Sequence, residues 1–217
     1  MPIITISRGT LSGGQAVAEC LAAKLEYPCV GREIVQEAAR KLGVSEETLS
    51  GKFETPPGRW DRLTHERRLY LHAVQAALAD QCVAGELVYH GLAGQLLLRG
   101  LPGVLRVRLI APLDMRVRAL ADAHHRMSPK AAEEFIESMD EDRRRWVRLM
   151  YGADVEDPSL YDLTINLQSI STETACAGIA EAVAQPQYQI TDEVRAKLEA
   201  FAAQCHEQLQ VATSQRS

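Results

Sequence analysis

A glycine-rich segment near the N-terminus carries residue types that can bind a phosphate group. It runs from Arg8 and Gly9 through Ser12, Gly13 and Gly14, after an apolar β-branched run at 3–6 and before an Ala-rich helical pattern. Glycines let backbone N–H groups converge, and the first helical turn adds unpaired donors and the positive end of its dipole. The segment is therefore typical of an anion site, with phosphate as the expected ligand. An ordinary strand-to-helix turn is the alternative.

The phosphate-loop template, Gly-x-x-x-x-Gly-Lys-Ser/Thr, matches this segment only in part. Gly9 and Gly14 keep the two glycines. Gln15 stands in place of the lysine that reaches the β- and γ-phosphates, and Ala16 in place of the hydroxyl residue that holds magnesium. The sequence thus keeps the backbone cradle and lacks two of its chemical side chains.

Three further residues could contact a ligand beside this loop. Arg32 follows a short extended piece at 27–30 and precedes a helix expected at 33–42. Arg59 belongs to an arginine cluster at the start of a helix expected at 60–82, where a solvated basic face is the alternative. His90 ends a strand expected at 86–90, and a packed core histidine is its alternative interpretation.

Composition narrows the class of protein. A chain of 217 residues with 46% hydrophobic content can bury the core of one α/β domain. A net charge of -5 argues against a nucleic-acid partner. Because the chain has no signal peptide and no long apolar span, we expect a cytoplasmic protein without a membrane partner. The scattered cysteines and the adjacent pair His124 and His125 lack metal spacing, so no metal site is expected.

Strand and helix patterns alternate along the chain, which predicts an α/β fold. We expect a parallel sheet of about five strands with helices on both faces. Ligands of such sheets bind at the carboxyl ends of the strands, so the glycine loop, Arg32 and His90 should share one rim. A helix opening at Ser128 and Pro129 should run to about residue 150. Residues 186–217 should add a helix at 192–209 and a disordered tail at 211–217.

The chain resembles the cytidylate-kinase-like family, a branch of the phosphate-loop nucleoside monophosphate kinases, over roughly residues 3–183. The order and spacing of short motifs carry the resemblance: Ile6-Ser7-Arg8 before Ser12-Gly13-Gly14, Gly31-Arg32-Glu33-Ile34, Gly91 with Gly94-Gln95, Val107-Arg108-Leu109-Ile110-Ala111-Pro112, and Asp157-Pro158-Ser159-Leu160-Tyr161-Asp162-Leu163-Thr164-Ile165-Asn166.

The resemblance implies a three-layer P-loop NTPase-like domain over residues 1–185, with a helical lid at about 124–150. It implies ATP and Mg²⁺, with a nucleotide or another phosphate-bearing small molecule as partner. The residues that would then line the ATP site are Arg8, Gly9, Ser12, Gly13, Gly14, Gln15 and Ala16. Arg32, Arg59 and His90 would face the acceptor. Arg143, Arg144 and Arg145 would close over the transferring phosphoryl group, although a solvated face is the alternative for them.

Two departures from the family pattern remove positive charge. Family members usually carry a basic residue where Gln15 stands, and an arginine in the segment where this chain has Gly91-Leu92-Ala93-Gly94. Loss of one transition-state donor costs on the order of 3 kcal/mol, or about a hundredfold in rate. Arg8, on the loop itself, could fold back and replace one of these charges.

The sequence leaves three functional hypotheses. The first is an enzyme that transfers the γ-phosphoryl group of ATP to a nucleoside monophosphate or a similar acceptor. The second is a kinase-fold module that binds a nucleotide or a protein partner for regulation and has lost catalysis. The third is a scaffold that pairs into a homodimer through its C-terminal helix, around Leu198, Phe201 and Leu209.

Overall fold

The structure is a computed structural model of the chain, and it describes residues 2–47, 49, 65–123 and 127–215. Arg59, the start of the helix expected at 60–82, the pair His124 and His125, and the last two residues lie outside the described part.

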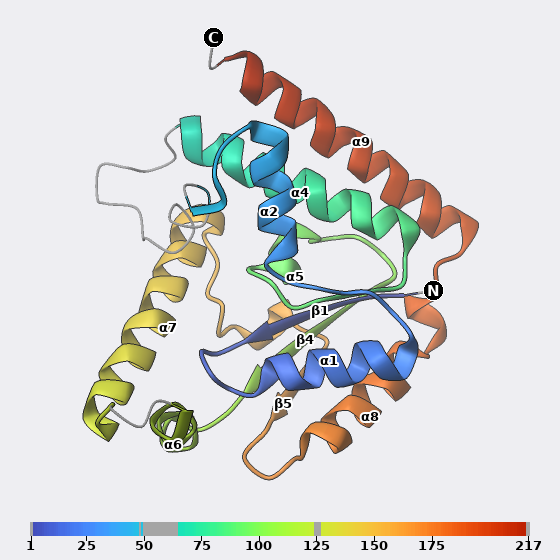
Figure 1. Cartoon of the computed structure of the whole chain (residues 1–217). Helices are drawn as coiled ribbons and strands as arrows, with labels where there is room; N and C mark the ends of the chain where they lie inside the picture. The colour runs from blue at the N-terminus through green and yellow to red at the C-terminus, as the bar shows by residue number, and fades with distance from the viewer. Residues whose placement is uncertain (1, 48, 50–64, 124–126, 216–217) are drawn as a thin grey trace.

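Five parallel strands form one sheet in the order β2-β3-β1-β4-β5, with β1 at its centre (Figure 1). Ile3 of β1 is in register with Leu87 of β3 and with Val104 of β4. The predicted parallel sheet is confirmed. The strands are β1 (Ile3–Arg8), β2 (Cys29–Val30), β3 (Leu87–Tyr89), β4 (Val104–Ile110) and β5 (Leu163–Asn166).

Helices cover both faces of this sheet, as the sequence predicts (Figure 1). They are α1 (Gly14–Leu25), α2 (Glu33–Leu42), α4 (His65–Ala84), α5 (Gly94–Leu97), α6 (Leu113–Ala123), α7 (Pro129–Tyr151), α8 (Thr172–Val183) and α9 (Asp192–Ser214), with short 3₁₀ turns at Pro158–Leu160 and Pro186–Tyr188.

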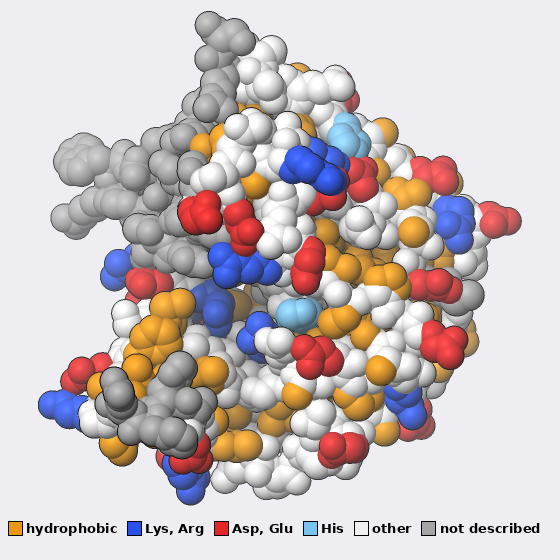
Figure 2. All heavy atoms as spheres, viewed as in Figure 1, with side chains coloured by type: hydrophobic (Ala, Val, Ile, Leu, Met, Phe, Trp, Pro, Cys, Tyr) orange, Lys and Arg blue, Asp and Glu red, His pale blue; other side chains and the backbone are white. Residues whose placement is uncertain are grey.

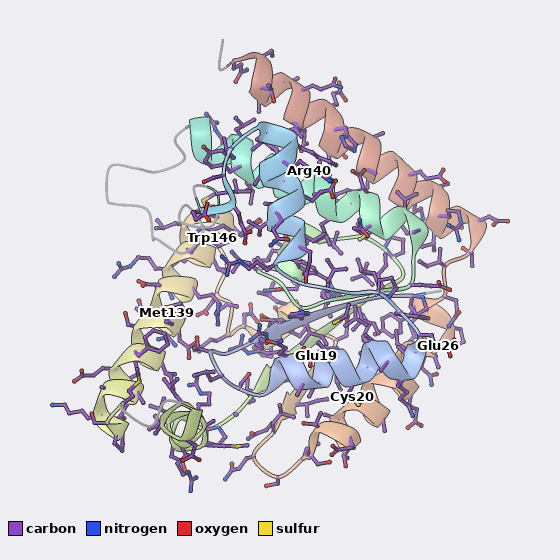
Figure 3. The ribbon with its side chains drawn as sticks, in the orientation of Figure 1. Glu19, Cys20, Glu26, Arg40, Met139 and Trp146 are labelled. Atoms are coloured by element: carbon purple, nitrogen blue, oxygen red, sulfur yellow. The ribbon has the colours of Figure 1, made fainter. Side chains whose placement is uncertain are left out.

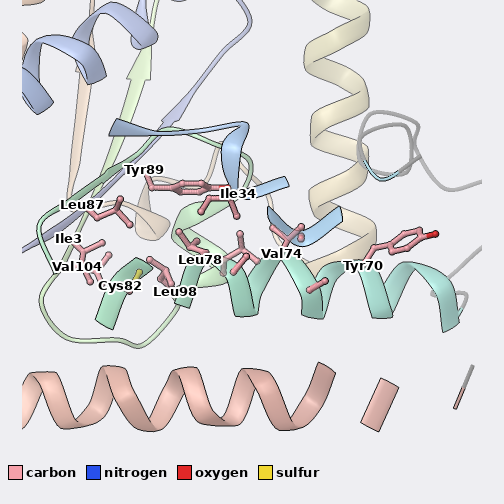
Figure 4. Packing of buried hydrophobic residues seen from close by; sticks show 14 of the residues in the cluster. Ile3, Ile34, Tyr70, Val74, Leu78, Cys82, Leu87, Tyr89, Leu98 and Val104 are labelled. Atoms are coloured by element: carbon pink, nitrogen blue, oxygen red, sulfur yellow. The ribbon is translucent and has the colours of Figure 1, made fainter. Parts of the chain in front are cut away.

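The alternation of side chains along β1 divides the core into two clusters. Ile4 and Ile6 pack against α1 and α8, where Val17 and Ile179 are fully buried. Ile3 points to the opposite face and joins the cluster beneath α2 and α4, of which Figure 4 shows a part. Because successive side chains of a strand point to opposite faces, one apolar run supplies both layers.

The long helix α7 begins as its sequence predicts. Pro129 occupies the first turn, and the Ser128 hydroxyl accepts a hydrogen bond from the Ala131 N–H. Ser171 and Thr191 cap α8 and α9 in the same way. These side chains satisfy donors that the first turn of a helix leaves without a backbone partner.

The last helix is longer than the sequence analysis expects, because α9 continues to Ser214 and includes most of the segment predicted as a disordered tail. Its apolar stripe, with Leu198, Ala202 and Cys205 buried, packs along α4. Ala212 is also buried, which holds the last turns in place. The apolar residues assigned to pairing with another chain are thus used within this chain. Within its described part, no helix is long and apolar enough to cross a membrane.

Candidate functional site

The glycine loop joins β1 to α1 at the carboxyl edge of the sheet. Gly13 has φ +81°, a left-handed conformation that L side chains rarely adopt, and α1 begins at the next residue. No side chain of the described residues caps this helix. The N–H groups of its first turn therefore point out of the helix without an internal partner, which is the arrangement that binds anions.

A cavity of about 580 Å³ opens beside this loop, a volume in the range of small-molecule sites. Figure 2 shows a hollow on this face with basic side chains and a histidine at its margin. Figure 3 marks Glu19 on α1, and Met139 and Trp146 on α7; all three line the cavity. Its charged lining residues are Arg8, Glu19, Arg32, Glu33, Asp142 and Arg143, and apolar side chains such as Leu71, Val74, Leu97 and Val147 complete the wall.

Arg8 folds back over the start of α1. A Cβ atom placed on Gly14 would lie 2.7 Å from Cδ of Arg8, so this glycine provides the space for the arginine. The Arg8 Nε atom is buried and has no hydrogen-bond partner within the described structure. Burial, and then the charge of Arg143, lower the pKa of Arg8. A cation beside a second cation in a half-buried position is favourable only when an anion joins them.

Arg143 reaches the same place from α7. Its guanidinium donates to the backbone oxygen of Arg8 at 3.0 Å and lies 3.5 Å from the Asp140 carboxylate. Burial lowers the pKa of Arg143; the Asp140 charge opposes this effect, and the charges of Arg108 and Arg116 add to it. Arg143 is thus the one member of the predicted arginine triplet that lines the cavity.

The other two arginines of the triplet do not line the cavity. Arg144 pairs with Glu141 at 3.0 Å and with Glu156 at 3.2 Å, and Arg145 is exposed. Consecutive helical residues are about 100° apart around the axis, so three in a row cannot face one cavity. Of the three arginines expected to act together, the structure therefore brings only Arg143 to the cavity.

The expected acceptor residues Arg32 and His90 both line the cavity. Arg32 is mostly exposed and pairs with Glu46 at 2.6 Å. The His90 ring packs on Gly31, where a Cβ atom would lie 2.6 Å from Cε1. Burial, and then the charge of Arg8, lower the pKa of His90, so its ring is neutral at pH 7.

Of the loop residues, Ser12 has a buried hydroxyl with no hydrogen-bond partner within the described structure. Gln15, at the lysine position of the template, donates to Glu19 at 2.9 Å, one helical turn along α1. Ala16 is exposed. Among the residues that the structure describes, no group of three His, Cys, Asp or Glu side chains could hold a metal ion.

Two sets of contacts at the site were not anticipated. Asp140 of α7 accepts a hydrogen bond from the Thr10 N–H of the loop, with Arg116 of α6 beside both. Asp140 and Arg143 follow the spacing of the buried α7 residues Ala132, Ile136 and Val147. This spacing is a signal in the sequence itself: a charged residue that continues the apolar stripe of a helix faces the protein, whereas the charged residues beside it face solvent.

The second set lies under the cavity and centres on the Tyr161 hydroxyl. This group donates to the Val155 carbonyl at 2.8 Å and accepts from Gln95 Nε2 at 3.2 Å. Arg108 Nη1 lies 3.4 Å from the same hydroxyl, and Ser7 Oγ lies 3.2 Å from it. The network thus joins β1, β4, α5 and the segment after α7. Ser7, Gln95, Arg108 and Tyr161 each stand in a short motif of the family resemblance, but the motifs do not indicate that these residues meet.

A central β1, a glycine loop leading into α1, and arginine-bearing helices at the strand ends define the P-loop kinase class of fold. The chain matches the sequence model of the cytidylate kinase-like family over residues 3–169, and it belongs to this family. It is similar to the cytidylate kinase of Natronomonas pharaonis, with 28% identity over 182 residues, which is 83% of this chain and 88% of that protein. The cytidylate kinase of Sulfolobus acidocaldarius is 25% identical over 171 residues, which is 78% of this chain and 87% of that protein.

Solved structures share the same fold. An uncharacterized protein from Eubacterium ventriosum aligns with a TM-score of 0.64 at 20% identity, over 84% of this chain and 97% of that chain. A shikimate kinase from Bacteroides thetaiotaomicron aligns with a TM-score of 0.51 at 11% identity, over 85% of this chain and 99% of that chain.

Proposed function

We propose that this protein transfers the γ-phosphoryl group of ATP to a nucleoside monophosphate or a similar small phosphate-bearing acceptor. Membership of the cytidylate kinase-like family supports the reaction class. The single observation that carries the proposal is the convergence of Arg8 and Arg143 on the mouth of the glycine loop, beside a cavity of about 580 Å³. Phosphoryl transfer depends mainly on positioning and on charge neutralisation, which two arginines and a backbone cradle can supply.

On the donor side, the glycine loop and the first turn of α1 would hold the phosphates of ATP. Arg8 would provide the positive charge that Gln15 cannot. The Ser12 hydroxyl, buried without a partner, fits a contact to a phosphate oxygen or to a water on Mg²⁺. The magnesium ion would come with ATP and be held mainly by its phosphates and by water, which is usual for this ion.

On the acceptor side, the cavity would hold the second substrate. Arg32 and His90 would contact its polar groups, and the apolar wall formed by Leu71, Val74 and Leu97 would contact its ring. Arg59, expected to bind the acceptor, lies outside the described residues. Arg143 would stabilise the phosphoryl group as it passes between the two sites.

The test is a turnover assay with ATP, Mg²⁺ and a panel of nucleoside monophosphates, run on the wild type and on three matched variants. We expect Arg143→Gln to lower kcat about a hundredfold, the effect typical of a transition-state donor. Arg144→Gln and Arg145→Gln make the same chemical change on the adjacent residues, outside the cavity, and should leave kcat within about twofold. No turnover by the wild type with any acceptor, or equal losses in all three variants, would argue against the proposal.

A second candidate function is a module that binds a nucleotide and does not turn it over. The contact of Gln15 with Glu19 favours it, because the residue at the lysine position donates to a carboxylate rather than to the loop. In that case Gln15→Lys should strengthen ATP binding without producing turnover. If the ATP affinity of Gln15→Lys equals that of the wild type, the result would argue against this second candidate, in which the loop is a nucleotide site without its lysine.

A further inference from the structure

We infer that Asp140 is an internal competitor of the phosphate ligand: its carboxylate occupies an anion position at the strand end of the glycine loop and holds helix α7 against the loop until a phosphate group displaces it. This inference rests on the proposed function only in taking phosphate as the ligand of the loop. It concerns the regulation of that site and makes Asp140 a positioning residue.

The contacts form a closed three-residue clasp. Asp140 Oδ1 accepts from the Thr10 N–H at 2.9 Å, and Asp140 Oδ2 accepts from Arg116 Nη1 at 2.5 Å. The same Nη1 atom donates to the Thr10 carbonyl at 3.2 Å. The clasp sits close over Gly9, where a Cβ atom would lie 3.2 Å from Arg116 Nη1. A carboxylate bound by a loop amide and a guanidinium has the ligands that a phosphate oxygen would have.

The clasp is shielded from water. The side chains of Arg116 and Asp140 are only 14% and 17% exposed. Burial alone would raise the pKa of Asp140, but hydrogen bonds from Arg116 and Thr10 outweigh it and lower the pKa. Asp140 is therefore ionised at neutral pH and acts as an anion at this site.

The surrounding charges explain why an anion is needed there. Arg116 of α6 pairs with Asp140, and Arg143 of α7 lies beside both; Arg8 of β1 and Arg108 of β4 in turn interact electrostatically with Arg143. Arg143 lies 3.5 Å from Asp140 Oδ1. Arg108 has Glu156 3.8 Å away, with Glu156 more than half exposed. Asp140 is thus the buried counter-charge of Arg116 and Arg143, and an incoming phosphate would take over that role.

The clasp also links the loop to the proposed lid. Asp140 contacts Thr10, and Arg143, one turn further along α7, contacts the Arg8 carbonyl. A ligand that replaces the Asp140 carboxylate would release one of these two attachments. Binding of phosphate and movement of α7 would then be coupled, with a coupling in the range of roughly 5- to 150-fold.

The experiment is calorimetric titration of inorganic pyrophosphate into the wild type, Asp140→Asn and Glu141→Gln at fixed ionic strength. Asp140→Asn removes the competing charge and should bind pyrophosphate about tenfold more tightly. Glu141→Gln is the matched control, because it removes the neighbouring carboxylate, whose partner is Arg144 outside the cavity. Its affinity should stay within about twofold of the wild type. Unchanged or weaker binding by Asp140→Asn overturns the inference.

Two additions keep the inference testable if Asp140→Asn fails to fold. Asp140→Ser makes a smaller neutral side chain and should tighten binding in the same way. In the ligand-free wild type, the Thr10 amide should exchange slowly with deuterium, and fast exchange contradicts the clasp without any variant. Neither readout requires turnover. If Asp140→Asn binds pyrophosphate more tightly but the wild type turns over no acceptor, only the enzyme proposal is contradicted. If the wild type turns over an acceptor but Asp140→Asn binds pyrophosphate no more tightly, only the clasp is contradicted.

Discussion

Two tyrosines of this protein offer a matched test of what a buried hydroxyl contributes. Tyr161 is only 8% exposed, and its hydroxyl donates to the Val155 carbonyl and accepts from Gln95. Tyr151 also has a buried hydroxyl, which has no hydrogen-bond partner within the described structure. Replacing either residue by phenylalanine removes the same atom. The two variants should nevertheless change the free energy of unfolding in different ways.

The expected size of the Tyr161→Phe effect follows from the partners left behind. Val155 keeps one donor, because its carbonyl also accepts from Arg108. Gln95 is 3% exposed, and its Nε2 atom would lose the Tyr161 hydroxyl as its acceptor. An orphaned buried donor costs about 1–3 kcal/mol, and the lost bond to Val155 adds about 1 kcal/mol. We therefore expect Tyr161→Phe to destabilise the fold by about 2–4 kcal/mol.

The Tyr151 hydroxyl is buried away from water, and no hydrogen bond within the described structure replaces the ones it would make to water. Tyr151→Phe should therefore be neutral or up to about 1 kcal/mol more stable than the wild type. Urea unfolding with a common m value measures both changes. For a chain of this size the Tm of Tyr161→Phe should fall by about 4–16 °C. Equal destabilisation in the two variants, or a neutral Tyr161→Phe, would refute the hydrogen-bond network under the cavity.

Two further predictions concern stability. Gly94→Ala should lower the free energy of unfolding by more than about 2 kcal/mol, because the new Cβ atom would lie 2.6 Å from the buried Tyr89 ring. Gly178→Ala is the control: a Cβ atom there would meet nothing within 4 Å, so this variant should be neutral or slightly stabilised in the same urea assay. The second prediction concerns Asp162 and the loss of stability in acid. Burial would raise the pKa of Asp162, but hydrogen bonds from Arg106 outweigh this effect and lower the pKa. The stabilising contribution of Asp162 is therefore present above pH of about 4 and is lost as the pH falls through the folded pKa. Asp162→Asn should therefore flatten the loss of stability in acid, and an unchanged slope below pH of about 5 would contradict the ion pair.

The sequence predicted the sheet because its signals are local. The β-branched runs of β1 and β4 and the hydroxyl caps of α7, α8 and α9 each lie within a few residues of the element that they define. The glycine loop was recognised for the same reason, since its spacing between strand and helix is a local pattern. The sequence also indicates Arg8 by its place on the glycine loop, and Arg143 by the family resemblance.

The contacts that complete the site depend on distances along the chain that local patterns do not encode. Thr10 meets Asp140 across 130 positions, and Gln95 meets Tyr161 across 66. Such pairs follow from how α7 docks on the rim of the sheet. The length of α9 was underestimated for a similar reason, because burial against α4 stabilises its last turns more than the polar sequence near Ser214 indicates.

The proposed function requires the glycine loop, with Arg8 and Arg143 at its mouth, to bind the phosphates of ATP. Calorimetric titration of ATP into the wild type, with and without Mg²⁺, tests it most directly. We predict saturable micromolar binding that requires Mg²⁺, at least tenfold weaker in Arg143→Gln and unchanged in Arg145→Gln. Absence of binding up to millimolar ATP in the wild type would contradict the account.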